Sequence, residues 1–353
     1  MSEKRSDRAV VAIAVALLAV ILIGEVVIYT SDYTDYSAEA SYSDGVVYYS
    51  VSADGSKDYS VVISDNGQYE AVTKLYLYYD ESYASDVEDV EADVGATALT
   101  QSYYLEQLVE LLEYRHVQDV EYVDAQGLAD ALSACVSSGS SAGVGLVCVN
   151  GALPDTVYTG QEGDLVLQWL EDGGSLFWAG NALGTEYAMT DGIVELGDEC
   201  QALFLGAECL NSDDELDRAY DEWAGNSYRS ALSLSNNCVK YGVNPSLLPD
   251  GRACLALGYE ADGYASIAAV QCGNGAVFVF GGDYTDYQRY DMAQVIASGI
   301  GPWSELVALE EGTATRGTSS GEAEVGTGCE GLAAYVYLGG YYPVYGKLFG
   351  LRP

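Results

Sequence analysis

Residues 143–149 read GVGLVCV, a short apolar run without a charged side chain. A run of this length, rich in valine, is typical of a strand that is buried on both faces in a parallel sheet. Strand-like and helix-like patterns alternate around it. Further strands are predicted at 74–80, 117–123 and 175–180, and helices at 105–115, 128–132 and 165–170. This alternation predicts an α/β fold, in which a mostly parallel sheet carries helices on both faces.

The same domain is expected to extend over residues 71–303, with one interruption. Residues 185–250 contain an acidic segment and several turn signals, which indicate an insertion or a lid. After it, three strands are predicted at 254–259, 266–271 and 276–280, and a closing helix at 291–300.

Residues 31–70 form a different kind of segment, with short runs rich in tyrosine and valine. The runs are separated by Asp44-Gly45, Asp54-Gly55 and Asn66-Gly67. Asp-Gly and Asn-Gly between alternating apolar runs are strong hairpin signals. The segment is therefore predicted to be a small antiparallel β meander.

The C-terminal residues 304–353 combine a polar segment with a last apolar one. Residues 312–328 are rich in Gly, Ser and Thr, so a flexible segment is expected there. A strand is predicted at 332–338. The uncharged stretch 331–346 leaves contact with a membrane open, but its tyrosines and glycines favour a packed strand followed by a tail.

The N-terminus contains an almost wholly apolar stretch at 9–28, preceded by Lys4, Arg5 and Arg8. Twenty helical residues span a bilayer core of about 30 Å, and basic residues favour the cytoplasmic side. Residues 1–30 are therefore predicted to form a cytoplasmic start and a single-pass transmembrane anchor, in contact with membrane lipid. The later residues would be an extracellular domain at the cell surface. A cleaved signal peptide is less well supported, because the nearest small-residue site, Ala38-Glu39-Ala40, lies far beyond the apolar stretch.

Charge and cysteine usage limit the partners and the chemistry. A formal net charge of −40 disfavours nucleic acid and anionic lipid surfaces as partners. All eight cysteines lie in the predicted extracellular part, where an even count indicates disulfide bonds without fixing their pairing. Without a C-x-x-C pair, and with one histidine, no metal site or cofactor is expected.

The stretch 144–184, which includes LVCVNGALPDT and SLFWAGNALG, resembles class I glutamine amidotransferase-like proteins, which have a flavodoxin-like fold. Phe280-Gly281-Gly282-Asp283 also looks like a late strand and loop of that family. The resemblance implies a nucleophilic cysteine at a sharp turn after a central strand, with a histidine nearby. Here Ala179 stands at the turn, and His116 precedes a strand, on the opposite edge of the sheet. The resemblance therefore implies a non-catalytic member.

Four polar residues follow predicted strands and would meet at the carboxyl edge of the sheet: Asn150, Asp155, Asn181 and Asp283. They are candidates for binding a sugar or a peptide, although turn residues would give the same pattern. An acidic run at 86–93 matches no calcium-loop spacing and is interpreted as a solvated surface.

These observations predict a membrane-anchored cell-surface protein with a non-catalytic ectodomain. Its role would be recognition or scaffolding in the cell envelope, through an envelope protein partner or self-association. Two alternatives stay open. An extracellular hydrolase would use carboxylates, with Asp155, Asp283 and Glu260 as candidates. A self-assembling subunit would build a lattice or filament.

Overall fold

The computed structural model describes residues 36–85, 100–212, 216, 218–223, 227–281, 286–329, 331–339 and 343–351. The predicted transmembrane stretch 9–28 lies outside them. Within the described residues, no helix is long and apolar enough to cross a membrane. The prediction of a single-pass anchor, with a cytoplasmic N-terminus and an extracellular domain, is corrected accordingly and is not used further.

The larger of two sheets has eight strands in the order β10-β11-β12-β13-β7-β5-β3-β4. The five strands from β13 to β4 are parallel neighbours, whereas β10, β11 and β12 extend the sheet in antiparallel fashion. The strands are β3 (Lys74–Tyr78), β4 (Asp119–Val123), β5 (Val144–Cys148), β7 (Ser175–Ala179), β10 (Asp221–Glu222), β11 (Cys254–Ala261), β12 (Tyr264–Cys272) and β13 (Gly275–Phe280). A small sheet joins β6 (Leu153–Pro154), β8 (Glu186–Met189) and β9 (Gly192–Glu195).

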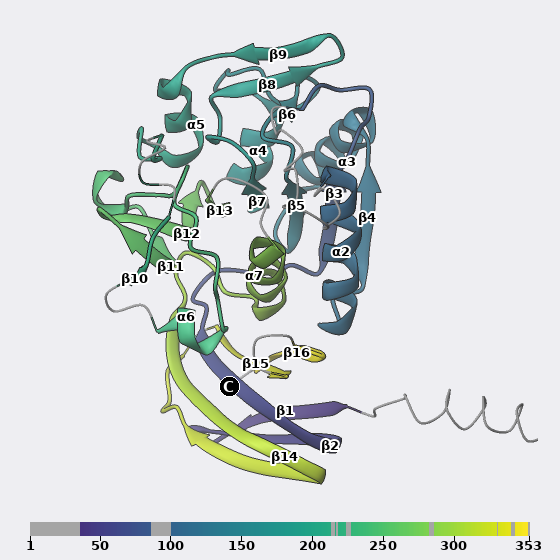
Figure 1. The fold of residues 1–353 in the computed structure, drawn as a ribbon, viewed down its shortest axis with the longest axis vertical. Helices are drawn as coiled ribbons and strands as arrows, with labels where there is room; N and C mark the ends of the chain where they lie inside the picture. Colours follow the sequence, from purple (N-terminus) through teal and green to yellow (C-terminus); the bar gives the residue numbers. More distant parts are fainter. Residues whose placement is uncertain are drawn as a thin grey trace, which may run out of the picture.

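Helices pack on both faces of this sheet (Figure 1). The leucines of α2 (Gln101–Tyr114) and the apolar residues of α7 (Asp286–Ser298) share one core. The leucines of α3 (Ala125–Ser138), α4 (Leu165–Glu171) and α5 (Gln201–Leu205) share the other. Local sequence fixes two helix starts, because the side chains of Thr100 and Asp124 accept hydrogen bonds from the first-turn amides.

The second sheet is antiparallel and joins the two ends of the described chain. Its strands are β1 (Ser37–Ser43), β2 (Val46–Asp65), β14 (Glu305–Glu324), β15 (Leu332–Leu338) and β16 (Tyr345–Gly350). One edge of β2 pairs with β14 along its whole length. The other edge pairs first with β1 and then with β15, which in turn pairs with β16. Asp44 and Gly45, at φ 52° and 84°, form the tight turn between β1 and β2.

The second predicted turn, Asp54-Gly55, is instead a corner within β2. The register of β14 shifts between Thr315 and Gly317, opposite this dipeptide. Contacts of the loop after β14 show how far the paired strands β2 and β14 bend. The amide of Gly326 bonds to Gly45, beside the start of β2, and the amide of Gly331 bonds to Asp65, at the end of β2. Those glycines are five residues apart and span at most about 18 Å, against about 65 Å for a straight 20-residue strand. The two-stranded pair of β2 and β14 is therefore strongly bent, which brings the two ends of β2 close together (Figure 1).

The predicted fold class, an N-terminal transmembrane helix and a small meander before a mostly parallel sheet, is wrong for this chain. Residues 312–328, expected to be flexible, supply most of β14 and enlarge the meander into a five-stranded sheet. The main sheet is mixed, with three antiparallel strands at one side. Pairing between strands about 250 residues apart leaves no local pattern, so the sequence did not show it.

The predicted disulfide bonds are also corrected, because no disulfide bond joins any of the eight cysteines, all of which lie in the described residues. Four of them are buried: Cys148, Cys209, Cys238 and Cys272. Buried free cysteine packs as a small apolar side chain, and an even number of cysteines does not distinguish this role from pairing.

Strand β15 connects the two sheets, because all seven of its residues are buried. Ala334 and Val336 lie in the core of the antiparallel sheet, whereas Tyr335 and Tyr337 lie in the core with α2 and α7. The Tyr335 hydroxyl donates to Gln294 Oε1 at 2.7 Å, and Arg115 Nε donates to the same oxygen at 2.9 Å. A buried polar contact therefore joins β15, α7 and the end of α2.

Replacing Tyr335 by Phe should remove one hydrogen bond from this buried contact. We expect the free energy of unfolding to fall by about 1–2 kcal/mol, measured by urea denaturation. Tyr122→Phe on β4 is the matched control, since Tyr122 is 49% exposed and should leave stability within about 0.5 kcal/mol. Equal effects of the two substitutions would contradict this account.

Candidate functional site

The carboxyl edge of the parallel strands holds two of the four predicted ligand-binding residues. Asn150 follows β5 and Asn181 follows β7. Asp155 directly follows β6, which is a strand of the small sheet. Asp283 lies outside the described residues, as does the acidic run 86–93.

Asn150 is buried and joins two loops of this edge. Its Nδ2 donates to the carbonyl oxygens of Ala84 and Ala152, both at 3.2 Å. Its own carbonyl accepts the hydroxyl of Ser85 at 3.3 Å. These bonds position the loops after β3 and β5, which is the turn role that the sequence left open.

Asp155 and Asn181 also bond within the protein. Asp155 Oδ1 accepts the hydroxyl of Tyr83 at 2.9 Å. Asn181 Oδ1 accepts the amide of Ala182 at 2.7 Å, and its carbonyl accepts Trp178 Nε1 at 2.7 Å. Asp155 therefore links its own loop to the loop after β3, whereas Asn181 stabilises the turn that follows β7.

The other residues considered for catalysis are separated from one another. Ala179 is fully buried, and burial raises the pKa of the Cys148 thiol to about 12. His116 Nδ1 lies 2.8 Å from the carbonyl of Gly346 in β16. Glu260 is on β11, with β12, β13 and β7 between it and β5. Among the described residues, no group of three His, Cys, Asp or Glu side chains is placed to hold a metal ion.

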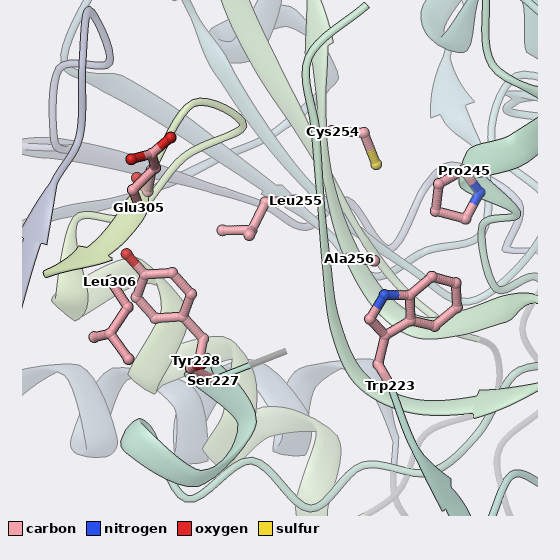
Figure 2. Close-up of a pocket in the computed structure, with 10 residues that line it drawn as sticks. Trp223, Ser227, Tyr228, Pro245, Cys254, Leu255, Ala256, Glu305 and Leu306 are labelled. Carbon is pink, nitrogen blue, oxygen red and sulfur yellow. The ribbon is translucent and has the colours of Figure 1, made fainter. Parts of the chain in front are cut away.

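A cleft of about 460 Å³ lies elsewhere, beside β11 and the start of β14 (Figure 2). It is lined by Trp223, Ser227, Tyr228, Pro245, Cys254, Leu255, Ala256, Ser304, Glu305 and Leu306. We call it the β11 cleft. These lining residues were not predicted from the sequence, where the available signal was Trp223, the one tryptophan of the insertion 185–250.

A bulge in β11 places Trp223 in the cleft. The register between β11 and β12 shifts between Leu257 and Glu260, and Gly258 has φ 78°. A Cβ atom at Gly258 would lie 2.3 Å from Ser266 Oγ, so the position requires glycine. The carbonyl of Gly258 accepts the amide of Trp223 at 3.4 Å, directly after β10.

Tyr228 enters the cleft from α6 (Tyr228–Ala231), which is held from two sides. Arg229 forms an ion pair with Glu222 at 2.6 Å and donates to the Tyr259 hydroxyl at 2.6 Å. Beyond the helix, the Asp291 carboxylate of α7 accepts the amides of Ser235 and Asn236. These contacts anchor α6 against β11 and α7.

Glu305 is the charged residue of the cleft lining. It is exposed at the first position of β14. Burial raises the pKa of the Tyr228 hydroxyl, and the negative charges of Glu305 and Asp65 add to the rise. The cleft thus combines the partly exposed ring of Trp223, apolar side chains and the negative charge of Glu305, whereas Tyr228 is 3% exposed and closes the cleft from within the core.

No family model and no curated protein matches the sequence. Among solved structures, a cytoplasmic protein from Salmonella typhimurium, STM3548, is similar at 12% identity and a TM-score of 0.34, covering 64% of this chain and 98% of its own. A cold-adapted beta-galactosidase from Rahnella sp. R3 shows 17% identity and a TM-score of 0.38, over 77% of this chain and 36% of its own. At such scores neither likeness supports an argument about function.

The expected membership of the class I glutamine amidotransferase-like family is corrected by these comparisons. No family model matches, and the similar structures are described as cytoplasmic proteins and glycosidases. The motifs behind the expectation were strand–glycine–helix units, which recur in many unrelated α/β folds.

The stability of the protein should depend on pH through Asp291, which is 1% exposed. Burial raises its pKa from 3.8 to about 7, although the bonds from Ser235 and Asn236 lower it. A carboxyl whose pKa is higher in the folded state stabilises that state below pH 4 and loses this contribution as the pH rises through 7.

We therefore expect Asp291→Asn to reduce the dependence of stability on pH. The wild-type contribution of this carboxyl should fall by up to about 4 kcal/mol between pH 4 and pH 8. Urea denaturation of both proteins at several pH values measures the slopes. Identical slopes would show that folding does not raise the pKa of Asp291 and would contradict this account.

Proposed function

We propose that this chain is a non-catalytic recognition or scaffolding protein that binds its ligand in the β11 cleft. The observation that supports this most directly is the lining of the cleft, where the partly exposed Trp223 and the exposed Glu305 accompany apolar side chains (Figure 2). A concave site that combines aromatic and apolar side chains with a few polar groups is the usual form of a ligand site. Aromatic rings contribute strongly to recognition, because they bury a large area with few rotatable bonds.

The arrangement of carboxylates supports recognition over hydrolysis. Glycoside hydrolysis needs two carboxyl groups about 5–10 Å apart across one pocket. The described candidates, Asp155 and Glu260, lie in different sheets, and Asp155 is bonded to Tyr83. In the β11 cleft, Glu305 is the one carboxylate among the lining residues.

The proposal is tested by screening soluble oligosaccharides and small neutral, cationic and anionic compounds for a rise in melting temperature. Ligands of the wild-type protein should bind Trp223→Ala at least about tenfold more weakly, because one aromatic wall is lost. The control is Tyr122→Ala on β4, which removes an exposed aromatic ring far along the sheet. Equal affinity for the wild type and both variants would reject the cleft as the site.

Self-assembly is a second candidate, and β14 is the observation that favours it. This strand of 20 residues pairs with β2 along one edge, and no other described strand pairs with it. A free strand edge is a template for pairing with another chain. Its glutamates, including Glu310 and Glu322, oppose such pairing between acidic copies.

Because charge repulsion is screened by salt, assembly through β14 should increase with ionic strength. Sedimentation velocity at low and high sodium chloride measures this. We expect larger species at high salt, and Thr313→Pro should reduce them by removing a backbone donor from the strand. A single monomeric species at every salt concentration would exclude this candidate.

A further inference from the structure

The β11 cleft is lined by negative charge and by no positive charge. Glu305 is exposed, and none of the other nine lining residues is charged. The whole chain has a formal net charge of −40. A bound anion would therefore be repelled, whereas a cation would gain from both the local carboxylate and the overall field.

The accessible aromatic ring of the cleft suits the same charge. Trp223 is partly exposed in the lining, whereas Tyr228 is 3% exposed and packs in the core, so Trp223 supplies the ring that a ligand can contact (Figure 2). The face of an aromatic ring attracts a cation, and tryptophan does so most strongly. An accessible tryptophan ring and one carboxylate are a suitable set of groups for an alkylated ammonium ion, whose methyl groups would also contact apolar side chains.

Two arginines of neighbouring elements are bonded elsewhere and do not line the cleft. Arg229 lies 4.5 Å from the ring centre of Tyr259 and is ion-paired with Glu222. Arg252 donates to the carbonyls of Phe204 and Gln271. Neither arginine is part of the lining, so Glu305 is not neutralised from within the cleft.

We infer that the β11 cleft binds a small organic cation, an alkylated or quaternary ammonium group, against the ring of Trp223 and with its charge attracted by Glu305. The volume of about 460 Å³ accommodates such a group with a short attached chain. This inference rests on the proposed function, since it names the ligand class of the same site.

Isothermal titration with choline, and with its neutral isostere 3,3-dimethylbutan-1-ol, tests the inference. The two probes have the same shape and differ in the charge of one atom. We expect choline to bind about tenfold more tightly, because the face of the Trp223 ring and the carboxylate of Glu305 attract the charge. Added salt should weaken choline binding and leave the alcohol unchanged.

Two substitutions locate the effect. Glu305→Gln should weaken choline binding several-fold and leave the alcohol unchanged, whereas Trp223→Ala should weaken both. The matched control is Glu322→Gln, which removes one negative charge from the same strand near its other end. An equal loss of choline affinity in the two glutamine variants would assign the attraction to overall charge and overturn the inference.

These measurements distinguish a failure of the cation inference from a failure of the proposed binding site. If the alcohol binds as tightly as choline and Trp223→Ala weakens both, the cation inference fails and the proposed binding site stands. If neither probe binds, the cation inference also fails, and the wider ligand screen decides the proposed function. Preference for choline that depends on both Glu305 and Trp223 supports the two together.

Discussion

Burial of β15 on both faces is the constraint on which the rest of the structure depends. Its alternate residues pack into two separate cores, and Tyr335 adds a hydrogen bond to Gln294 on α7. A strand that is apolar on both faces has no stable exposed state, so both sheets must form around it. This explains why a strand near the C-terminus lies at the centre of the molecule.

The β11 cleft is a consequence of this joining of sheets. Trp223, Tyr228 and Leu255 come from the mixed sheet and its insertion, whereas Glu305 and Leu306 begin the antiparallel sheet. The junction is fixed by Asn66, which donates to the carbonyl of Gly299 at 2.8 Å and accepts the hydroxyl of Ser304 at 2.8 Å. The two walls of the cleft are thus held in place by contacts close to it.

Sequence patterns predicted those strands and helices that are determined by their own side chains. The runs at 143–149 and 175–180 contain β5 and β7, because continuous apolar side chains suit buried strands. The strand at 305–324 was missed because its glycines and glutamates disfavour strands, and only pairing with β2 orders the segment. Asn150 and Asp155 were recognised as polar loop residues, but their bonding partners are fixed by tertiary structure. Trp223 was missed because a bulge at Gly258 positions it.

The order of pairing around β2 also determines when this protein can fold during its synthesis. Until residue 305 has left the ribosome, β1 is the one strand of its sheet available to β2, which then exposes most of its edges. Strands that pair over such separations form slowly, and open edges in the waiting chain promote aggregation. The nascent chain therefore passes through a long interval in which its N-terminal sheet is incomplete, and a chain that stops before β14 would remain in that state.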